Sequence, residues 1–337
     1  MKAPPPNKLA FRLRGYFTDH LPRVRGMSPH TIHSYRDSLM LFLRFLTSER
    51  KSRVQDLDLN GIEPDDVIAF LAYLEEVRKN GVTTRNVRLA AIHAFFRYVG
   101  TYHPEQLDRV QRILAVPFKR ARQRVIEYLE RDEIEAVLSG INRASRDGRR
   151  DYSLLATMFN TGARVQEIVD LRVCDLQLIR PSQIRLFGKG KKERFCPLWP
   201  QTAQVLRDHC QEYHLDLRSD ARVFLNHRGT PLTRFGVRYI LAKHLDCARG
   251  DVSTLARKRL HPHSMRHSTA VALLTSGVDL TTISHWLGHS NPNTTNRYAT
   301  IDLEMKRRAI TKVKPATHRA RSSWRRNESI LEWLESL

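Results

Sequence analysis

Residues 261–300 read HPHSMRHSTAVALLTSGVDLTTISHWLGHSNPNTTNRYAT, and they combine helix boundaries with side chains that bind phosphate. Ser264 is expected to cap a helix that ends at Gly277, because serine accepts a hydrogen bond from a free backbone N–H and glycine stops helices. A second helix is expected to begin near Asp279 and to end at Gly288. The apolar residues between these boundaries recur at helical spacing.

The polar side chains of this stretch suit phosphate chemistry. A guanidinium group binds phosphate oxygens in a bidentate fashion, imidazoles move protons, and a phenol becomes a nucleophile when a base or cations lie nearby. Each of these residues alone would more often be structural, but their grouping favours chemistry. The candidates are His263, Arg266, His267, His289 and Tyr298.

The composition predicts a polyanionic partner. The chain has 337 residues, enough for two domains, and 57 lysines and arginines against 35 acidic residues, a formal net charge of +22. Nucleic acid is the leading candidate. A membrane surface is the alternative, but the sequence has no signal peptide and no run of about 18 apolar residues, so a soluble cytoplasmic protein is expected.

The four cysteines show neither metal-site nor disulfide spacing. Cys174, Cys196, Cys210 and Cys247 form no CxxC pair, and the chain is long rather than a short secreted scaffold. We expect reduced, mostly packed thiols and no zinc site.

Residues 1–115 predict a domain made only of helices. Helical spacing of apolar residues follows helix-start signals at Ser28-Pro29, at Glu63-Pro64, at Thr83 or Thr84, and at Pro104. The second of these helices is expected to end at Asn80-Gly81. Arg85, Arg88 and Arg97 are expected to be exposed cations that contact either phosphate or solvent.

Two basic segments lack apolar periodicity. Residues 116–124 read VPFKRARQR and predict a domain linker whose cations, including Lys119, Arg120 and Arg122, favour salt-dependent binding of DNA. Residues 306–326 are also basic and precede a short apolar helix pattern. That pattern cannot be stable alone and is expected to dock on another surface through Ile330, Leu331, Trp333, Leu334 and Leu337.

The middle of the chain predicts helices and one hairpin. Helices are expected over 130–138 and 151–159, and a third helix carries Arg164 and Glu167 on one face. These two residues have either a functional role or form an ordinary surface ion pair. Residues 184–187 and 194–198 alternate as two strands around a glycine-rich basic turn. The turn lacks the P-loop pattern and is interpreted as a basic finger that contacts DNA.

Five motifs stand in a recognisable order: TGARVQEI, GKGKKERFCPL, HPHSMRH, LGHS and Tyr298, nine residues after His289. In this order the chain resembles the tyrosine recombinase, or phage integrase, family, including its Xer-like members. The resemblance implies a mainly α fold with a small β-hairpin (α+β) that closes like a clamp around DNA. The implied parts are a helical core-binding domain (1–115), a basic linker (116–124), a catalytic domain (125–302) and a basic tail with a docking helix (303–337).

The resemblance also implies chemistry: site-specific recombination through a covalent 3′-phosphotyrosyl intermediate and a Holliday junction, without metal, ATP or another cofactor. Two guanidinium groups bind the phosphate, a hairpin lysine protonates the departing 5′ oxygen, two imidazoles assist and a tyrosine attacks. Glu167 is expected to orient Arg164, and His267 is less expected to touch phosphate. The implied catalytic residues are Arg164, Lys189, His263, Arg266, His289 and Tyr298.

The implied partner is double-stranded DNA with specific sites, bound by four protomers that are monomers or weak oligomers when free. The C-terminal elements, including Ile330, Trp333 and Leu334, then dock on the same or a neighbouring protomer. Two other functions stay open: a helix-turn-helix regulator without catalysis, and a topoisomerase-like nicking-closing enzyme. The candidate DNA contacts are Arg85, Arg88, Lys119, Arg120, Arg122 and Lys191.

Overall fold

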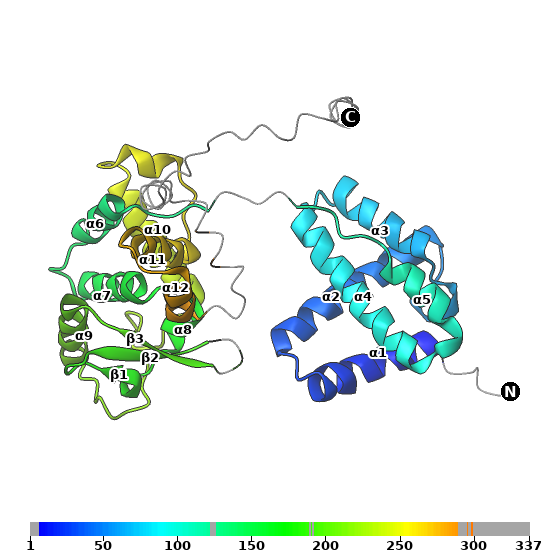
Figure 1. The fold of residues 1–337 in the computed structure, drawn as a ribbon, viewed down its shortest axis with the longest axis horizontal. Helices are drawn as coiled ribbons and strands as arrows, with labels where there is room; N and C mark the ends of the chain where they lie inside the picture. Colours follow the sequence, from blue (N-terminus) through cyan, green and yellow to red (C-terminus); the bar gives the residue numbers. More distant parts are fainter. Residues whose placement is uncertain are drawn as a thin grey trace, which may run out of the picture. The chain divides into compact units, whose positions relative to one another are not determined.

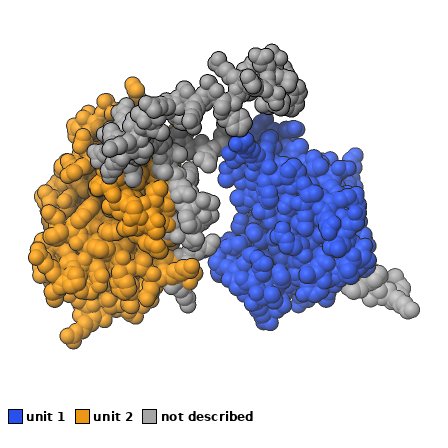
Figure 2. All heavy atoms as spheres, viewed as in Figure 1, with its two compact units in different colours: residues 1–124 blue, residues 125–337 orange. Residues whose placement is uncertain are grey.

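The computed structural model describes residues 7–121, 126–188, 190, 192–288, 295 and 298. The chain divides into two compact units, residues 1–124 (unit 1) and 125–337 (unit 2), which are coloured separately in Figure 2. Each unit has a hydrophobic core of its own. None of the described helices combines the length and the apolar character that crossing a membrane requires.

All the regular secondary structure in the described part of unit 1 is helical (Figure 1). Its core is rich in aromatic side chains, among them Phe42 and Phe70, whose ring centroids lie 5.1 Å apart. Its elements are α1 (Lys8–Gly15), a π-helix η1 (Tyr16–Val24), α2 (Pro29–Glu49), α3 (Pro64–Glu76), α4 (Val82–Tyr102) and α5 (Leu107–Leu114), with 3-10 turns at Val54–Asp56, Leu59–Gly61 and Pro104–Gln106.

Two predicted helix starts in unit 1 are confirmed. The Ser28 hydroxyl accepts a hydrogen bond from the Thr31 backbone N–H at the start of α2, and Glu63 caps α3. The cap expected at Thr83 or Thr84 is wrong, because Gly81 adopts the extended cap conformation and α4 begins at Val82. The end expected for α3 at Asn80-Gly81 is also wrong, since the helix stops at Glu76.

Unit 2 surrounds one buried helix, α7 (Arg146–Thr161), whose side chains are mostly buried and which packs against α9 and α11. The predicted span 151–159 is therefore too short. The helix α9 is absent from the sequence-based prediction. The remaining helices are α6 (Arg131–Ser139), α8 (Val165–Asp170), α9 (Pro200–Glu212), α10 (Arg234–Ala248), α11 (Pro262–Thr275) and α12 (Leu280–Leu287), with 3-10 turns at Val173–Asp175 and Ser253–Arg257.

The boundaries of α11 and α12, the last two helices that the structure describes, differ in how well the sequence predicted them. Asp279 caps α12 through hydrogen bonds from two backbone N–H groups, and Gly288 ends it in the left-handed conformation, as expected. The cap expected at Ser264 is wrong. The helix α11 begins at Pro262, with His261 as its N-cap, because proline fits the first helical position. Ser264 therefore lies inside the first turn.

The predicted hairpin is confirmed as part of a three-stranded antiparallel sheet of order β1-β2-β3 (Figure 1). The strands are β1 (Leu176–Gln177), β2 (Gln183–Phe187) and β3 (Glu193–Pro197). In the β2–β3 register Leu186 faces Arg194, and Ile184 faces Cys196. These four side chains point to the inner face of the sheet, where Ile184, Leu186 and Cys196 are buried.

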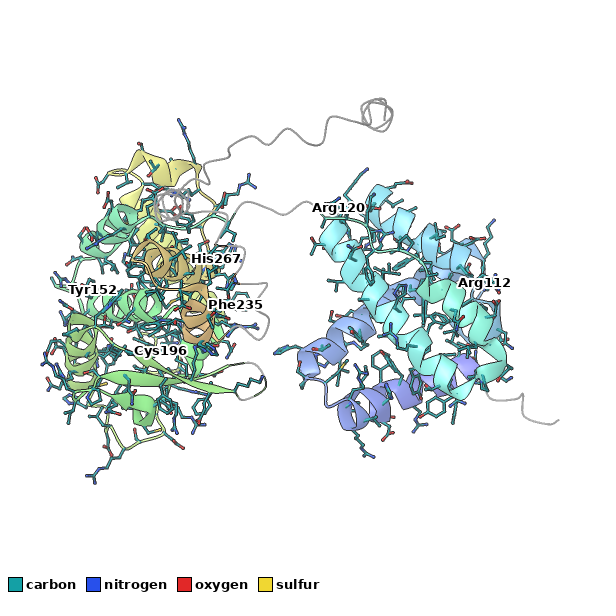
Figure 3. The ribbon with its side chains drawn as sticks, viewed as in Figure 1. Arg112, Arg120, Tyr152, Cys196, Phe235 and His267 are labelled. Atoms are coloured by element: carbon teal, nitrogen blue, oxygen red, sulfur yellow. The ribbon has the colours of Figure 1, made fainter. Side chains whose placement is uncertain are left out.

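All four cysteines are free, as expected. Cys196 and Cys210 are buried, whereas Cys174 and Cys247 are exposed, so the expected packing holds for two of them. Figure 3 shows Cys196 among the side chains of unit 2.

Candidate active site

The C-terminal end of α12 gathers three arginines from distant parts of unit 2. The last carbonyl groups of a helix have no partner within it, and they form the negative end of the helix dipole. Here three consecutive carbonyls each accept a hydrogen bond from a different guanidinium group. The pairs are Arg194 Nε to Trp286 O at 2.9 Å, Arg266 Nη2 to Leu287 O at 2.5 Å, and Arg164 Nη2 to Gly288 O at 3.1 Å.

Arg164 reaches this helix end from the start of α8. Gly162 ends α7 with a φ of +59°, and the chain turns at once into α8, with Arg164 as its N-cap. The turn is tight, since a Cβ on Gly162 would lie 2.5 Å from Leu287 Cδ2. The Arg164 side chain remains 34% exposed, so its guanidinium group is open to a ligand from solvent.

Glu167 lies between two of these guanidinium groups. Its Oε1 accepts from Arg164 Nη1 at 2.7 Å, and its Oε2 accepts from Arg194 Nη2 at 2.7 Å. Burial by itself raises the pKa of Glu167, but the hydrogen bonds from Arg194 and Arg164 outweigh burial and lower it. With only 3% of its side chain exposed, Glu167 is no ordinary surface partner, and the expected contact with Arg164 is confirmed.

Arg266 is the most enclosed member of the site, with 1% of its surface exposed. Its Nη1 donates to Gly162 O at 2.7 Å, while its buried Nε has no hydrogen-bond partner among the described residues. Burial and then the nearby Arg164 lower the pKa of Arg266 to about 9, so the group stays protonated at neutral pH. An orphaned, charged donor is suited to an anionic oxygen.

Tyr298 lies against α11 and α12. Its hydroxyl group is 2.6 Å from His267 Nδ1, and its ring packs in a small apolar cluster that includes Leu274 and Ile283. The ring of His263 lies 4.6 Å from that of His267 in an edge-to-face arrangement. His267 (labelled in Figure 3) thus contacts the phenol directly, a role that the sequence interpretation did not assign. The available signal was the spacing of four residues between His263 and His267, which places both side chains on one face of a helix.

The base of the hairpin loop adjoins the same site. Gly188 N donates to Lys192 O at 2.8 Å, which closes the loop. A Cβ on Gly188 would lie 3.4 Å from Glu167 Oε1 and 3.7 Å from Arg164 Nη1. The backbone that leads into the loop is therefore adjacent to the arginine cluster. Lys189, Lys191 and His289 lie outside the described residues, as do Arg122 and the predicted docking residues Ile330, Trp333 and Leu334.

Comparison with known proteins identifies the family. The phage integrase family model matches residues 127–305, and the model of the N-terminal SAM-like domain of phage integrases matches residues 16–100. The chain belongs to the phage integrase family. It is thus a tyrosine recombinase, an enzyme that cleaves and rejoins DNA strands. A regulator without catalysis is not favoured.

The recombinase has relatives that match almost its whole length. It is 37% identical over 330 residues to the putative integrase/recombinase y4rC of Sinorhizobium fredii, covering 98% of each chain. It is 30% identical over 312 residues to the tyrosine recombinase XerC of Bacillus pumilus, covering 90% of this chain and 96% of that protein.

Two solved structures share the fold of the recombinase. The XerH site-specific recombinase bound to its difH substrate matches with a TM-score of 0.63 at 21% identity, over 83% of this chain and 79% of XerH. The Tn1549 transposon integrase in complex with transposon right end DNA matches with a TM-score of 0.67 at 17% identity, over 88% and 98% of the two chains.

Two DNA contacts predicted in unit 1 of the recombinase are less exposed than expected. The Arg85 side chain is 11% exposed and lies 3.6 Å from Glu75, and Arg88 is half-buried, with a pKa lowered by burial. Their expected exposure is wrong because α4 packs these side chains against its neighbours. Lys119 is also paired with Glu75, at 3.0 Å. Arg97 and Arg120 are exposed, as predicted for Arg97.

Among the residues that the structure describes, no group of three or more histidine, cysteine, aspartate or glutamate side chains lies close enough to hold a metal ion.

Proposed function

We propose that this recombinase exchanges DNA strands at specific sites by attack of Tyr298 on a phosphodiester, through a 3′-phosphotyrosyl intermediate and a Holliday junction. The observation that carries the proposal is the common framework of the site: α11 and α12 hold the phenol, its imidazole partner and the enclosed Arg266. Double-stranded DNA is the proposed partner, supported by the bound DNA in the solved relatives and by the net charge of +22.

Arg164 and Arg266 are proposed to stabilise the transition state. The five-coordinate phosphorus carries more negative charge on its nonbridging oxygens than the ground state, so cations fixed in advance lower the barrier. Arg164 is partly exposed and has donors left over, and Arg266 Nε has no hydrogen-bond partner in the part of the chain that the structure describes.

Proton transfer is assigned to an imidazole pair and to Lys189. The imidazole pair His263 and His267 is proposed to receive the phenolic proton, because the Tyr298 hydroxyl already bonds one ring and the second ring is adjacent. Lys189 is proposed to protonate the departing 5′ oxygen. His289 is proposed to donate a hydrogen bond to the phosphate. The phosphotyrosyl bond keeps the energy of the phosphodiester, so a 5′ hydroxyl from another duplex can reverse the step.

The test is formation of a covalent protein–DNA adduct on a nicked cognate site. Tyr298→Phe removes one oxygen, and we expect it to bind DNA but to form no adduct. Tyr16→Phe is the matched control, because Tyr16 is equally buried and its hydroxyl has no described partner. Adduct formation at the normal yield in Tyr298→Phe would refute the proposal. Recombinant products from two sites would separate strand exchange from a nicking-closing activity.

Assembly is proposed from the family. We propose four protomers on two DNA sites, joined by the C-terminal segment that includes Trp333 and Leu334. A tetramer would allow two duplexes to exchange strands within one complex.

A further inference from the structure

Arg194 is the third guanidinium group at the α12 end, and the mechanism above gives it no role. It lies on the inner face of β3, and 11% of its side chain is exposed. Its Nη2 donates to Glu167 and its Nε donates to Trp286 O, at 2.7 and 2.9 Å. A single planar group therefore joins the hairpin strand, the first turn of α8 and the last turn of α12.

These hydrogen bonds belong to a network that surrounds the Arg164 side chain. Arg164 is held by Glu167 on one side and by Gly288 O on the other. Arg194 contacts both holders: it bonds Glu167, and a Cβ on Gly288 would lie 3.1 Å from Arg194 Cδ. Its bond to Trp286 O fixes the same helix end two residues earlier. Arg194 therefore helps to fix both groups that hold the Arg164 side chain.

Charge makes this dependence strong. Glu167 is buried and ionised, and a buried carboxylate needs cationic hydrogen-bond partners. Burial alone lowers the pKa of Arg194, but its bonds to Glu167 outweigh burial and raise it. Without Arg194, Arg164 is the one cation among the described residues that still forms a hydrogen bond with Glu167. The carboxylate is then free to turn fully toward Arg164 and to draw that guanidinium group away from the phosphate side.

We propose that Arg194 is a positioning residue for DNA cleavage, which sets the guanidinium group of Arg164 through Glu167 and fastens the hairpin to the end of α12. The inference rests on the proposed role of Arg164 at the phosphate. It extends to the loop, because Gly188 at the loop base lies beside Glu167 and Arg164. Arg194 touches no reacting atom itself.

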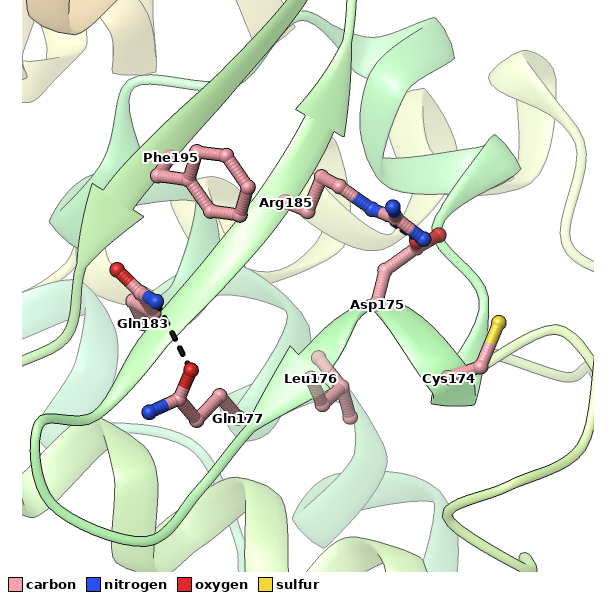
Figure 4. Close-up of a pocket in the computed structure, with 7 residues that line it drawn as sticks. All are labelled: Cys174, Asp175, Leu176, Gln177, Gln183, Arg185 and Phe195. Atoms are coloured by element: carbon pink, nitrogen blue, oxygen red, sulfur yellow. Dashed lines mark hydrogen bonds and ion pairs between the residues drawn. The ribbon is translucent and has the colours of Figure 1, made fainter.

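The same sheet offers a matched control. Arg185 on β2 binds Asp175, whose side chain is 3% exposed, with its Nε 2.9 Å from Asp175 Oδ1 (Figure 4). This pair also joins a strand arginine to a buried carboxylate. It lies on the other face of the sheet, since Arg185 is in register with Phe195 rather than with Arg194. Arg185→Gln therefore breaks a pair of the same kind away from the arginine cluster, with a more exposed arginine (40% against 11% for Arg194).

The experiment compares Arg194→Gln, Arg194→Lys, Arg185→Gln and Arg164→Ala in the full-length chain. Single-turnover adduct formation is measured on saturating nicked DNA with either a normal scissile phosphate or a neutral methylphosphonate in its place. Single-site affinity and the melting temperature are measured in parallel. The methylphosphonate lacks the anionic oxygen that a guanidinium clamp stabilises, so it reports specifically on the clamp.

We expect Arg194→Gln to cleave the normal phosphate roughly 10²-fold more slowly, the loss typical of a misplaced catalytic group, with affinity changed less than about threefold. The loss on the methylphosphonate should be much smaller, and Arg164→Ala should show the same substrate dependence. Arg194→Lys keeps a positive charge but lacks the planar guanidinium fork that spans Glu167 and Trp286 O, so its rate should be intermediate. Arg185→Gln should cleave normally.

Three results would overturn this inference without refuting the proposed role of Arg164. One is a normal rate in Arg194→Gln, and another is an equal loss on both substrates, which would indicate a general structural defect. If Arg194→Gln does not fold, Arg194→Lys is used for the test. A normal cleavage rate in Arg194→Lys is then the third result that refutes the inference. A normal rate in Arg164→Ala would instead refute the proposed clamp and this inference with it, whereas a slow Arg164→Ala beside a normal Arg194→Gln refutes this inference alone.

Discussion

Replacing Gly162 by alanine tests the geometry at the end of α7. The residue has a φ of +59°, and a Cβ would lie 2.5 Å from Leu287 Cδ2 and 3.3 Å from Thr269. An L-residue in the left-handed region costs roughly 1–2 kcal/mol. Overpacking against a buried leucine adds roughly 1–3 kcal/mol. We therefore expect Gly162→Ala to lower the free energy of unfolding of unit 2 by roughly 2–5 kcal/mol.

Gly229→Ala separates the cost of the left-handed backbone conformation from the cost of the clash with Leu287. Gly229 has a φ of +74°, but a Cβ there meets nothing within 4 Å, so only the conformational cost of roughly 1–2 kcal/mol applies. Urea unfolding followed by tryptophan fluorescence reports on unit 2, because all four tryptophans lie in residues 125–337. Equal losses in both variants at an unchanged urea dependence would refute the argued clash with Leu287.

Gly162→Ala is also expected to slow DNA cleavage. The carbonyl oxygen of Gly162 accepts a hydrogen bond from Arg266 Nη1 at 2.7 Å, so a shift of this turn moves the guanidinium group. Under conditions where both variants are folded, Gly162→Ala should form the covalent adduct more slowly than Gly229→Ala. If the two rates are equal, Arg266 does not depend on this turn.

Three further outcomes are expected. Burial by itself raises the pKa of Asp151, but hydrogen bonds from His244 and Arg150 outweigh burial and lower that pKa. The ionised carboxylate therefore stabilises the folded state above about pH 4. This stabilisation is lost as the pH falls through the pKa of Asp151 in the folded protein. Asp151→Asn should cost about 3 kcal/mol at pH 7, and urea titrations should show the gap narrowing below about pH 4. Lys189→Ala should be rescued by a substrate with sulfur at the bridging 5′ position, and a rate that sulfur leaves unimproved would remove its general-acid role. Deletion of 328–337 should preserve binding to one site but abolish cooperative binding to paired sites in gel-shift titrations, and retained cooperativity would place the helix on its own protomer.

The sequence predicted elements with strong local signals. Ser28 and Asp279 mark helix starts because their side chains accept hydrogen bonds from backbone N–H groups within the first turn, and at Glu63 the Asp66 side chain accepts from the backbone N–H of the N-cap residue itself. The prediction failed where two local signals compete, as at Ser264, where Pro262 two residues earlier fits the first helical position better. The strand β1 has two residues, too few for any periodicity.

The candidate site was predictable as a set of residues but not as a geometry. The residue types and the order of the motifs indicated Arg164 and Arg266, whereas their partners are set by contacts across 124 and 104 positions of the chain. Arg194 had no local signal, because a basic residue in a strand next to a basic loop predicts solvent exposure. The predicted exposure of Arg85 was wrong because helical spacing does not reveal that Glu75 lies nearby.

The convergence at α12 explains how three cations can be held close together before any phosphate is present. Like charges repel, and Arg164 is a cause of the lowered pKa of Arg266. Three adjacent carbonyl dipoles and the buried carboxylate of Glu167 oppose that repulsion. The free energy that orders the arginines is thus supplied by folding, and the transition state meets donors that need little further reorganisation. Because the acceptors at α12 are backbone atoms, conservative substitutions of the Trp286 or Leu287 side chains leave them in place, and only a displacement of the helix end disturbs all three arginines at once.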